Sequence, residues 1–286
     1  MTDAEISRFS DQIEALLVNR NPRGMSGVRD ALKPGYVARA ARRLLDADKE
    51  ILIATGFPVA NTFETDGPAG AIALYDFCLQ GGGRPVLMAG APLINAIGAD
   101  RATHIINGFS QADADREAER FFAKHSPSLM IVIERPGAAA DGHYYNITGK
   151  DISAEVRPFE PWVDRAPCPV IAIGDGGNEI GMGSAGKVLE TLNIRPAVST
   201  CDELVVADVS NWGAYAIIAM AQKLSDIEHH WSIQPRRLLG MLSAAGSVDG
   251  VTHQNTLTED GLDCSECEDL LDKIHHVLFA PTPTDG

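Results

Sequence analysis

The sequence contains little of what marks secreted, membrane-spanning or nucleic-acid-binding proteins. Its 286 residues include only 5 cysteines, and an odd number in a chain of this length does not suggest a disulfide framework. No run of apolar residues is long enough to cross a bilayer. Lysine and arginine total 24 against 39 aspartates and glutamates, and the formal net charge of −15 repels phosphate backbones and anionic membrane surfaces. We therefore expect neither nucleic acid nor a membrane among the partners of this protein.

Several signatures of targeting and catalysis are also missing. Residues 1–17 are acidic and amphipathic and lack the basic start and apolar run of a secretory signal, so we expect a cytoplasmic protein. The chain has no G-x-S-x-G, no H-E-x-x-H and no phosphate loop ending in Gly-Lys-Ser/Thr. These absences argue against serine hydrolases, zincins and P-loop enzymes.

The close cysteine pair, Cys264 and Cys267, has the spacing of a zinc or redox site. No second pair and no histidine at a matching spacing completes such a site. Acidic neighbours such as Glu266 and Glu268 would also raise a thiol pKa rather than lower it. The simpler interpretation is a chance spacing on a carboxy-terminal helix.

What the sequence does contain is a hydrophobic fraction of 45%, enough for a sizeable core and arranged in short runs. Most runs are continuous rather than alternating, which is typical of strands buried on both faces of a parallel sheet. The predicted strands cover residues 51–55, 85–89, 104–106, 129–133, 170–173 and 204–207. Helical spacing is found at residues 36–47, 68–79, 112–124, 185–192 and 213–224.

This alternation predicts a doubly wound α/β fold, with a mostly parallel sheet and helices on both of its faces. We expect residues 1–286 to form a single domain, because no repeat, low-complexity tract or long linker divides them. We also expect an additional amino-terminal helix at 5–19, a hairpin or lid within 141–160 and a frayed tail at 281–286. The small-residue helix at 213–221 predicts close internal packing or a homo-oligomer contact.

The most informative motif runs from Pro169 to Gly183 and reads PVIAIGDGGNEIGMG. An apolar run breaks there into a glycine-rich loop, which predicts a buried strand ending where the backbone approaches a ligand closely. Asp175 and Glu179 in this loop are candidates for a metal site or for proton transfer. The alternative is a tight strand-to-helix turn in which Asp175 only caps the helix.

Polar residues also follow three other predicted strands. Ligands in open α/β sheets bind beyond the carboxyl ends of the strands, so these residues are candidates for the same site. The segments are Glu64-Thr65-Asp66-Gly67-Pro68, Glu134-Arg135-Pro136-Gly137 and Asp208-Val209-Ser210-Asn211-Trp212-Gly213. Together with the glycine-rich loop, they bring carboxylates, amides and glycines to one edge of the sheet.

Each of these candidates also has a purely structural interpretation. His143, which lies in a loop after Asp141 and Gly142, is the best histidine candidate, but loop histidines are more often structural or exposed. The other structural alternatives are a helix N-cap for Asp66, a solvated carboxylate for Glu64, a surface ion pair for Glu134 and Arg135, and helix caps for Ser210 and Asn211.

Taken together, these motifs resemble the carboxy-terminal domain of D-glutamate cyclase. The resemblance spans roughly residues 50–255, and it is specific because the motifs occur in order. Besides the segments above, it includes Asp141-Gly142-His143-Tyr144-Tyr145-Asn146 and Gly246-Ser247-Val248-Asp249-Gly250-Val251-Thr252.

The resemblance implies a hydro-lyase that converts D-glutamate to 5-oxo-D-proline and water. The α-amine must be neutral to attack, and the γ-carboxylate must be protonated or bound to a cation to become a good electrophile. The implied catalytic residues are Asp66 and Glu134, either of which would take the amine proton, and Asp175 and Glu179, which would donate a proton or hold a divalent metal such as Mg²⁺. The implied substrate-binding residues are Glu64, Arg135, His143, Gly176, Gly177, Asn178, Ser210 and Asn211.

Two other functions remain open at this point. A metal-dependent hydrolase or lyase would use the same carboxylates on another small amino acid, a lactam or a phosphorylated metabolite. A non-catalytic binding module would hold a small ligand without turning it over. The clustering of potential acids and bases, rather than of hydrogen-bonding groups alone, favours an enzyme.

Overall fold

The computed structural model describes residues 1–59, 61–225 and 232–280, and its centre is a six-stranded sheet with parallel neighbours throughout. The strand order is β5-β4-β1-β6-β7-β8. The strands are β1 (Glu50–Thr55), β4 (Arg84–Ala89), β5 (Thr103–Ile105), β6 (Leu129–Ile133), β7 (Val170–Gly174) and β8 (Glu203–Val206). All six predicted strands and the doubly wound α/β fold are confirmed.

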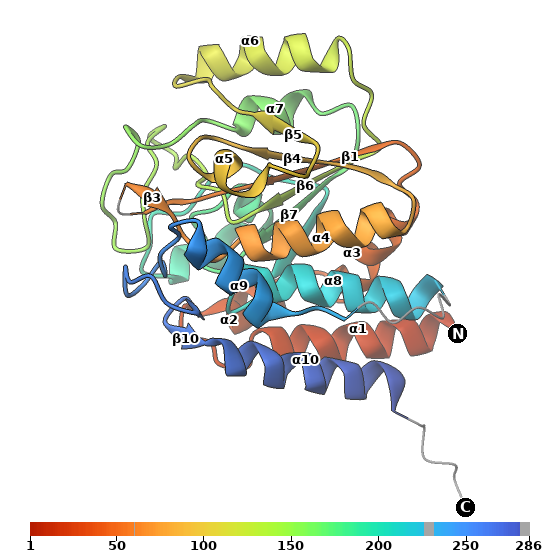
Figure 1. Ribbon diagram of the computed structural model, residues 1–286. Coiled ribbons are helices and arrows are strands. Elements are labelled where there is room, and N and C mark those ends of the chain that lie inside the picture. The colour runs from red at the N-terminus through yellow and green to blue at the C-terminus, as the bar shows by residue number, and fades with distance from the viewer. Residues whose placement is uncertain (60, 226–231, 281–286) are drawn as a thin grey trace, which may run out of the picture.

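Helices cover both faces of this sheet (Figure 1). One face carries α6 (Gln111–Phe122) and α7 (Glu160–Arg165), and the other carries α3 (Tyr36–Leu45), α4 (Pro68–Gln80) and α8 (Ser210–Ser225). Outside the second group lie α1 (Asp3–Leu17), α9 (Pro235–Ala244) and α10 (Cys264–Phe279), and two shorter helices are α2 (Met25–Ala31) and α5 (Leu93–Ile97). The expected amino-terminal helix is present as α1, whereas the predicted frayed tail, 281–286, lies outside the described residues.

The helix predicted at residues 185–192 is wrong in type. The chain forms a 3₁₀ helix instead, η1 (Met182–Thr191), which is interrupted at Gly186, where φ is 68°. A residue in the left-handed region cannot continue the hydrogen-bond ladder of an α-helix. The apolar spacing of this segment therefore does not lead to a regular α-helix.

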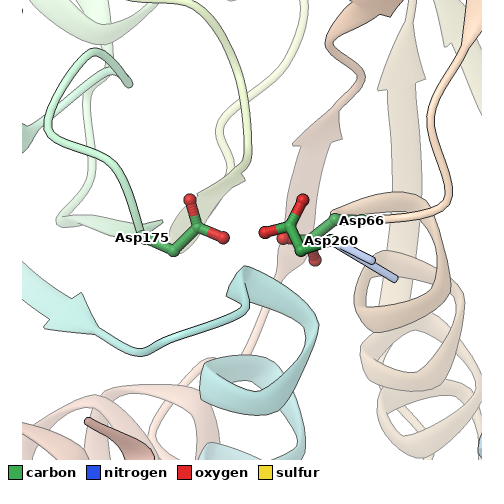
Figure 2. A group of neighbouring side chains, drawn as sticks. All are labelled: Asp66, Asp175 and Asp260. Carbon is green, nitrogen blue, oxygen red and sulfur yellow. The ribbon is translucent and has the colours of Figure 1, made fainter. Parts of the chain in front are cut away.

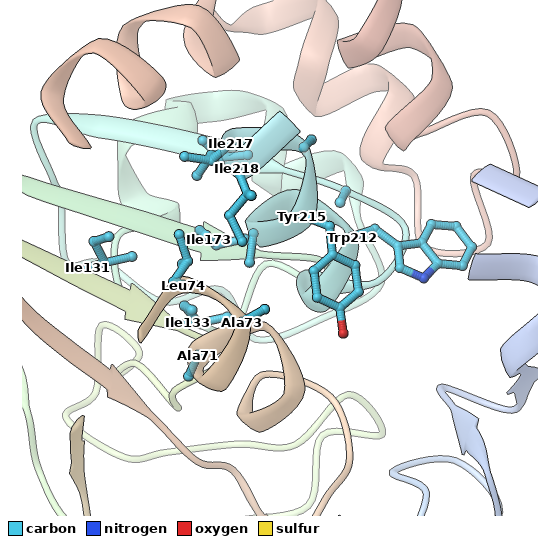
Figure 3. Close-up of a cluster of buried hydrophobic side chains, with 14 of the residues drawn as sticks. Ala71, Ala73, Leu74, Ile131, Ile133, Ile173, Trp212, Tyr215, Ile217 and Ile218 are labelled. Atoms are coloured by element: carbon cyan, nitrogen blue, oxygen red, sulfur yellow. The ribbon is translucent and has the colours of Figure 1, made fainter. Parts of the chain in front are cut away.

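The strands read as continuous apolar runs because alternate residues enter two different cores. In β1, Ile51 and Ile53 belong to the core beneath α3, α4 and α8, whereas Leu52 and Ala54 belong to the core beneath α6 and α7. Figure 3 shows the first of these cores, in which isoleucines of β6 and β7 pack against α4 and α8. Neither face of the central strands is left to solvent.

The strand order places a crevice between the two halves of the sheet. From β1 the chain runs outward through β4 to β5, then returns to β6 on the other side of β1 and runs outward through β7 to β8. The connections leave β1 and β6 in opposite directions, and doubly wound folds bind ligands at this point, beyond the carboxyl ends of the strands. The register pairs Thr55 with Ile133. Residues that follow β1 and β6 therefore begin at the same level.

Short irregular segments close over this edge of the sheet. In the segment predicted to form a hairpin or lid, isolated bridges join Ala138 to Tyr144 and Tyr145 to Asp151. Two small antiparallel pairs supplement it, β2 (Pro58–Val59) with β3 (Thr62–Phe63) and β9 (Thr258–Glu259) with β10 (Leu262–Asp263). These short segments bring side chains to this edge that the strands of the main sheet do not carry.

Within the described residues, no helix combines the length and the apolar character needed to cross a membrane. All five cysteines are free thiols. Cys264 and Cys267 are buried on α10 and belong to the same core as residues of α8 and α9. The predicted carboxy-terminal helix is therefore present.

A carboxylate from one helix caps another helix in this fold. Glu14 of α1 is buried and accepts hydrogen bonds from the backbone N–H groups of Gly35 and Val37, both at 3.1 Å, at the start of α3. Ser10 donates to Glu14 at 2.6 Å and accepts from the N–H of Ala38 at 2.9 Å. The first N–H groups of a helix have no partner within it, so this pair supplies the missing acceptors.

Replacing Glu14 with alanine should lower the free energy of unfolding by about 1–3 kcal/mol, because buried N–H groups of α3 lose their acceptor. Urea denaturation measures the change. The matched control is Gln12→Ala, an exposed position on the same helix, which should change stability by less than about 0.5 kcal/mol. Equal effects of the two substitutions would contradict the capping role.

Candidate active site

A cavity of about 440 Å³ lies beyond the carboxyl ends of the central strands. Its lining includes six carboxylates, of which that of Glu155 is exposed, and a seventh, Asp66, lies directly behind them. We call Glu64, Asp66, Glu134, Asp175, Glu179 and Asp260 the acidic cluster. None of them is more than 9% exposed. Figure 2 shows the carboxylate of Asp175 facing those of Asp66 and Asp260.

Glu134 enters the cavity because it is the first residue after β6. Its N–H still continues the sheet by donating to the carbonyl oxygen of Ile173 at 3.1 Å, but its φ of 45° turns the chain sharply. Ser210 Oγ donates to Glu134 Oε2 at 2.5 Å and fixes the orientation of the carboxylate. The surface ion pair considered for Glu134 and Arg135 is therefore wrong, since both residues are buried.

The glycine-rich loop after β7 positions Asp175 and Glu179. The two oxygens of Glu179 accept from the N–H groups of Gly176 at 2.9 Å and Gly177 at 2.8 Å. Gly177 has φ of 98°, which side-chain-bearing residues rarely adopt. Glu179 thus holds the loop in the shape that presents Asp175 to the cavity.

Asp66 caps a helix, as the structural interpretation of this residue predicted. The helix is α8, however, and its first residue, Ser210, lies 144 residues further along the chain. Its oxygens accept from the N–H groups of Ser210 at 2.9 Å, Asn211 at 2.7 Å and its neighbour Gly67 at 2.8 Å. Both oxygens are engaged, and Asp66 does not line the cavity. Its main role in this geometry is to join the segment after β1 to the segment after β8.

Among the described residues, a single guanidinium, that of Arg23, contacts the acidic cluster. Its Nη1 lies 2.6 Å from Asp175 Oδ1 and 2.7 Å from Asp260 Oδ2. The loop that carries Arg23 is held in place by Asp208, whose carboxylate accepts from the N–H groups of Arg20 at 2.7 Å and Asn21 at 3.1 Å. One positive charge therefore faces six carboxylates.

Burial and crowding raise the pKa of every carboxyl group in the cluster. Loss of hydration is the largest cause in each case, and it brings the pKa of Asp66 to about 7. Neighbouring carboxylates raise the pKa further, most clearly for Glu134, whose neighbours Asp175 and Glu179 act in the same direction. For Asp175, Arg23 opposes the effect of burial. At neutral pH the cluster must hold protons or a cation.

Two oxygens of the cluster have no hydrogen-bond partner although they are buried, namely Asp175 Oδ2 and Glu64 Oε1. Both residues line the cavity. Buried polar atoms are usually paired, and an unpaired one at a cavity wall marks a place where a ligand or an ion can bind.

Three carboxylates lie close enough together to hold a metal ion from the cavity side. One oxygen each from Glu134, Asp175 and Glu179 lies within 4.8 Å of the others, and all three residues line the cavity. A second group, Asp66 with Asp175 and Asp260, meets the same distance criterion, but Arg23 already occupies the space between two of its members. Oxygen donors of this kind suit Mg²⁺.

Backbone strain is concentrated around the same cavity. Five described residues other than glycine have a positive φ, and three of them line the cavity: Glu134 at 45°, His253 at 57° and Asp260 at 52°. Such conformations cost roughly 1–3 kcal/mol each and cluster at functional sites. The strain supports the choice of this cavity as the site.

The predicted site residues fall into three groups. Glu64, Glu134, Asp175, Gly176, Asn178 and Glu179 line the cavity, and Asp66, Gly177, Ser210 and Asn211 lie behind it. Asn211 is fully engaged there, since its side chain accepts from the N–H of Gly70 at 2.6 Å and donates to Thr65 O at 3.1 Å and Glu259 Oε2 at 2.7 Å.

Arg135 and His143 lie away from the cavity. The buried guanidinium of Arg135 donates to the carbonyl oxygens of Thr55 at 2.9 Å and Arg157 at 3.0 Å, and burial lowers its pKa to about 10. His143 is exposed, with Nδ1 at 3.0 Å from Asp151 Oδ2. This geometry gives neither side chain a direct route to a ligand in the cavity.

Sequence reasoning missed four residues that the structure brings to the site: Arg23, Lys150, His253 and Asp260. None of them stands directly after a strand of the main sheet. The only local signal in the sequence was Glu259-Asp260-Gly261, where two carboxylates stand directly before a glycine, as in a turn.

Comparison with known proteins supports a relationship over most of the chain. A model of the family described as "D-glutamate cyclase-like, C-terminal" matches residues 13–275. The human protein named "D-glutamate cyclase, mitochondrial" is 30% identical over 230 residues, which is 68% of this chain and 36% of the human protein. The chain thus spans little more than a third of the length of the curated relative that it matches.

Replacing Glu64 with glutamine should stabilise the protein at alkaline pH and weaken the dependence of its stability on pH. Because the folded state raises the pKa of Glu64, it holds a proton that the unfolded chain releases above about pH 4.3. The wild type therefore loses stability as pH rises, by up to about 1.4 kcal/mol per pH unit for one such group.

Urea denaturation at a series of pH values between about 5 and 8 measures this slope. Glu64→Gln should show a shallower fall than the wild type, and the exposed Glu190→Gln should match the wild type. A wild-type stability that rises across this range, or an unchanged slope in Glu64→Gln, would contradict the electrostatic crowding described above.

Proposed function

Because this chain belongs to the D-glutamate cyclase-like family, we propose that it is a hydro-lyase that converts D-glutamate to 5-oxo-D-proline and water. The observation that carries the proposal is the convergence of Glu134, Asp175 and Glu179 on one cavity, with an unpartnered oxygen on Asp175. The family resemblance supplies the substrate, and the carboxylates supply groups suited to the reaction. The cavity is also large enough for a small amino acid, and its acidic lining suits the ammonium group of such a ligand.

The reaction sets a clear demand on the site. A bond forms between the α-nitrogen and the γ-carboxyl carbon, a carbon–oxygen bond breaks, and two protons move from the ammonium group to the departing oxygen. No net proton is taken up or released. The site therefore needs groups that both accept and donate protons near neutral pH, and carboxyl groups with raised pKa values meet this need.

We assign the two proton-transfer roles from the surroundings of each carboxylate. Burial raises the pKa of Asp175, but its contact with Arg23 opposes this effect and favours the ionised form, so of the two residues Asp175 is better suited to accept a proton from the ammonium group. Glu134 has carboxylate neighbours and, in the described part of the chain, no ion pair, which favours the protonated form that donates to the departing oxygen. This assignment reverses the one inferred from the sequence, which could not show Arg23. Ser210 keeps Glu134 in position.

The residues present also fit a divalent cation. Glu134, Asp175 and Glu179 would hold it through oxygen atoms, and it would supply Lewis-acid polarisation of the γ-carboxyl group. Dialysis against a chelator, followed by an activity assay with and without added Mg²⁺, separates this possibility from proton transfer by the carboxyl groups alone.

For its location we propose the cytoplasm, on the ground that all five cysteines are free thiols. The human relative carries the word mitochondrial in its name. Fractionation of cells that express this protein is the direct test.

The purified protein should convert D-glutamate to 5-oxoproline, and Asp175→Asn should reduce the rate by about 100-fold or more, because an amide neither accepts nor releases the proton. The product is measured by chromatography, and circular dichroism confirms the fold of the variant. Asp100→Asn, an exposed aspartate away from the cavity, is the matched control and should retain full activity.

Wild-type turnover by a folded Asp175→Asn protein would falsify the role of this residue. A wild-type protein that acts on a lactam, a phosphorylated metabolite or another amino acid but leaves D-glutamate unchanged would overturn the proposed reaction while keeping the site. Tight binding of D-glutamate without turnover would identify a binding module instead.

A further inference from the structure

The cavity is acidic in its depth and carries two basic side chains at its mouth. The carboxylates of the acidic cluster have little exposure, whereas Lys150 and His253, together with the carboxylate of Glu155, line the cavity from exposed positions. We propose that Lys150, assisted by His253, binds the α-carboxylate of the substrate and so orients the amino acid with its amine toward the acidic cluster. This inference rests on the proposed function and adds a specificity-determining residue to it.

The loop that carries Lys150 is rigidly built. Asn146 Oδ1 accepts from Thr148 N at 3.1 Å, Thr148 Oγ1 at 2.8 Å and Lys150 N at 2.9 Å. Asn146 N also donates to Lys150 O at 3.0 Å, which closes the turn. The backbone of Lys150 is therefore held in place by hydrogen bonds, and only its side chain has to be ordered when a ligand binds.

The same loop is hydrogen-bonded to the glycine-rich loop after β7. Asn178 Nδ2 donates to the carbonyl oxygen of Tyr145 at 2.9 Å, and Asn178 is the residue immediately before Glu179. The mouth and the depth of the cavity are thus joined through one side chain. A ligand that reaches from Lys150 to Asp175 would lie between two directly connected segments.

The ammonium group of Lys150 is available to a ligand. Glu155 also lines the cavity from an exposed position, but within the described ranges no ion pair joins it, or any other carboxylate, to Lys150. His253 faces the cavity from the opposite loop, in which Asp249 Oδ1 accepts from Val251 N at 2.9 Å and Thr252 N at 2.7 Å. The side chains of Lys150 and His253 therefore have no acceptor among the residues that the structure describes.

The charges of D-glutamate favour one orientation of this substrate in the cavity. The amine is attracted to the acidic cluster, and the γ-carboxyl group must reach a proton donor there to react. The α-carboxylate does not react and stays ionised throughout, so the buried carboxylates repel it. The mouth, with the ammonium group of Lys150, is the part of the lining that offers this group an opposite charge.

Calorimetric titration tests the inference with D-glutamate and its two amides. Lys150→Ala should weaken D-glutamate binding by about 10-fold or more, since a charge-assisted hydrogen bond is lost, and Lys150→Arg should retain most of the affinity. The exposed Lys187→Ala on η1 is the matched control and should bind like the wild type.

The two amides show which carboxylate Lys150 binds. D-Glutamine keeps the α-carboxylate, so it should show the same loss of affinity in Lys150→Ala. D-Isoglutamine has a neutral amide at that position, so it should bind the variant and the wild type alike. A loss that follows the γ-carboxylate instead, or wild-type affinity of Lys150→Ala for D-glutamate, would overturn the inference.

The same titrations separate this inference from the proposed function. If the wild type binds D-glutamate with the expected dependence on Lys150 but produces no 5-oxoproline, the proposed reaction fails and the inference on binding stands. If the wild type turns over D-glutamate and Lys150→Ala is unaffected, only the inference fails. Absence of D-glutamate binding to the wild type overturns both.

Discussion

The site depends on the cost of keeping six carboxylates out of water around one guanidinium. Burial removes their hydration, and each ionised group repels the others across a short distance. Arg23 compensates for part of this charge, chiefly through its contacts with Asp175 and Asp260. The remaining charge has to be neutralised by protons, a cation or the ammonium group of a ligand. The same constraint that destabilises the empty site therefore favours an amine-bearing substrate.

The fold accepts this cost because the acidic residues also join its parts. Asp66 connects the segment after β1 to the start of α8, and Glu179 shapes the loop after β7. Glu134 is held by Ser210, the first residue of the same helix. Loss of one such group would therefore disturb both the chemistry and the relative placement of three strand ends. Stability and function cannot be separated cleanly at these positions.

Much of the fold follows directly from the sequence. Strands buried on both faces need continuous apolar runs, so β1, β6 and β7 were recognisable. Glu134 and Asp175, the residues directly after β6 and β7, both line the cavity, as the sequence predicted. Side-chain direction was not recognisable in this way. Arg135 follows Glu134 immediately, yet its guanidinium binds the carbonyl oxygens of Thr55 and Arg157 outside the cavity.

The loops were the least predictable part of the site. Arg23 and Asp260 come from turns whose sequences have no hydrophobic period, and only tertiary contacts place them beside Asp175. The sequence therefore showed that acids would gather, but not which cation would join them. Arg23, which the sequence did not reveal as part of the site, also changed the roles expected for Glu134 and Asp175.

The central claim is that the metal-free acidic cluster holds protons at neutral pH. Infrared spectroscopy of the chelator-treated protein tests it directly, through the carbonyl stretching band of protonated carboxylic acids at pH 7 and its change in Asp175→Asn and Glu134→Gln. We expect such a band in the wild type, shifted in deuterium oxide and reduced in at least one of the two variants. A wild-type spectrum with only ionised carboxylates at pH 7 would contradict the account.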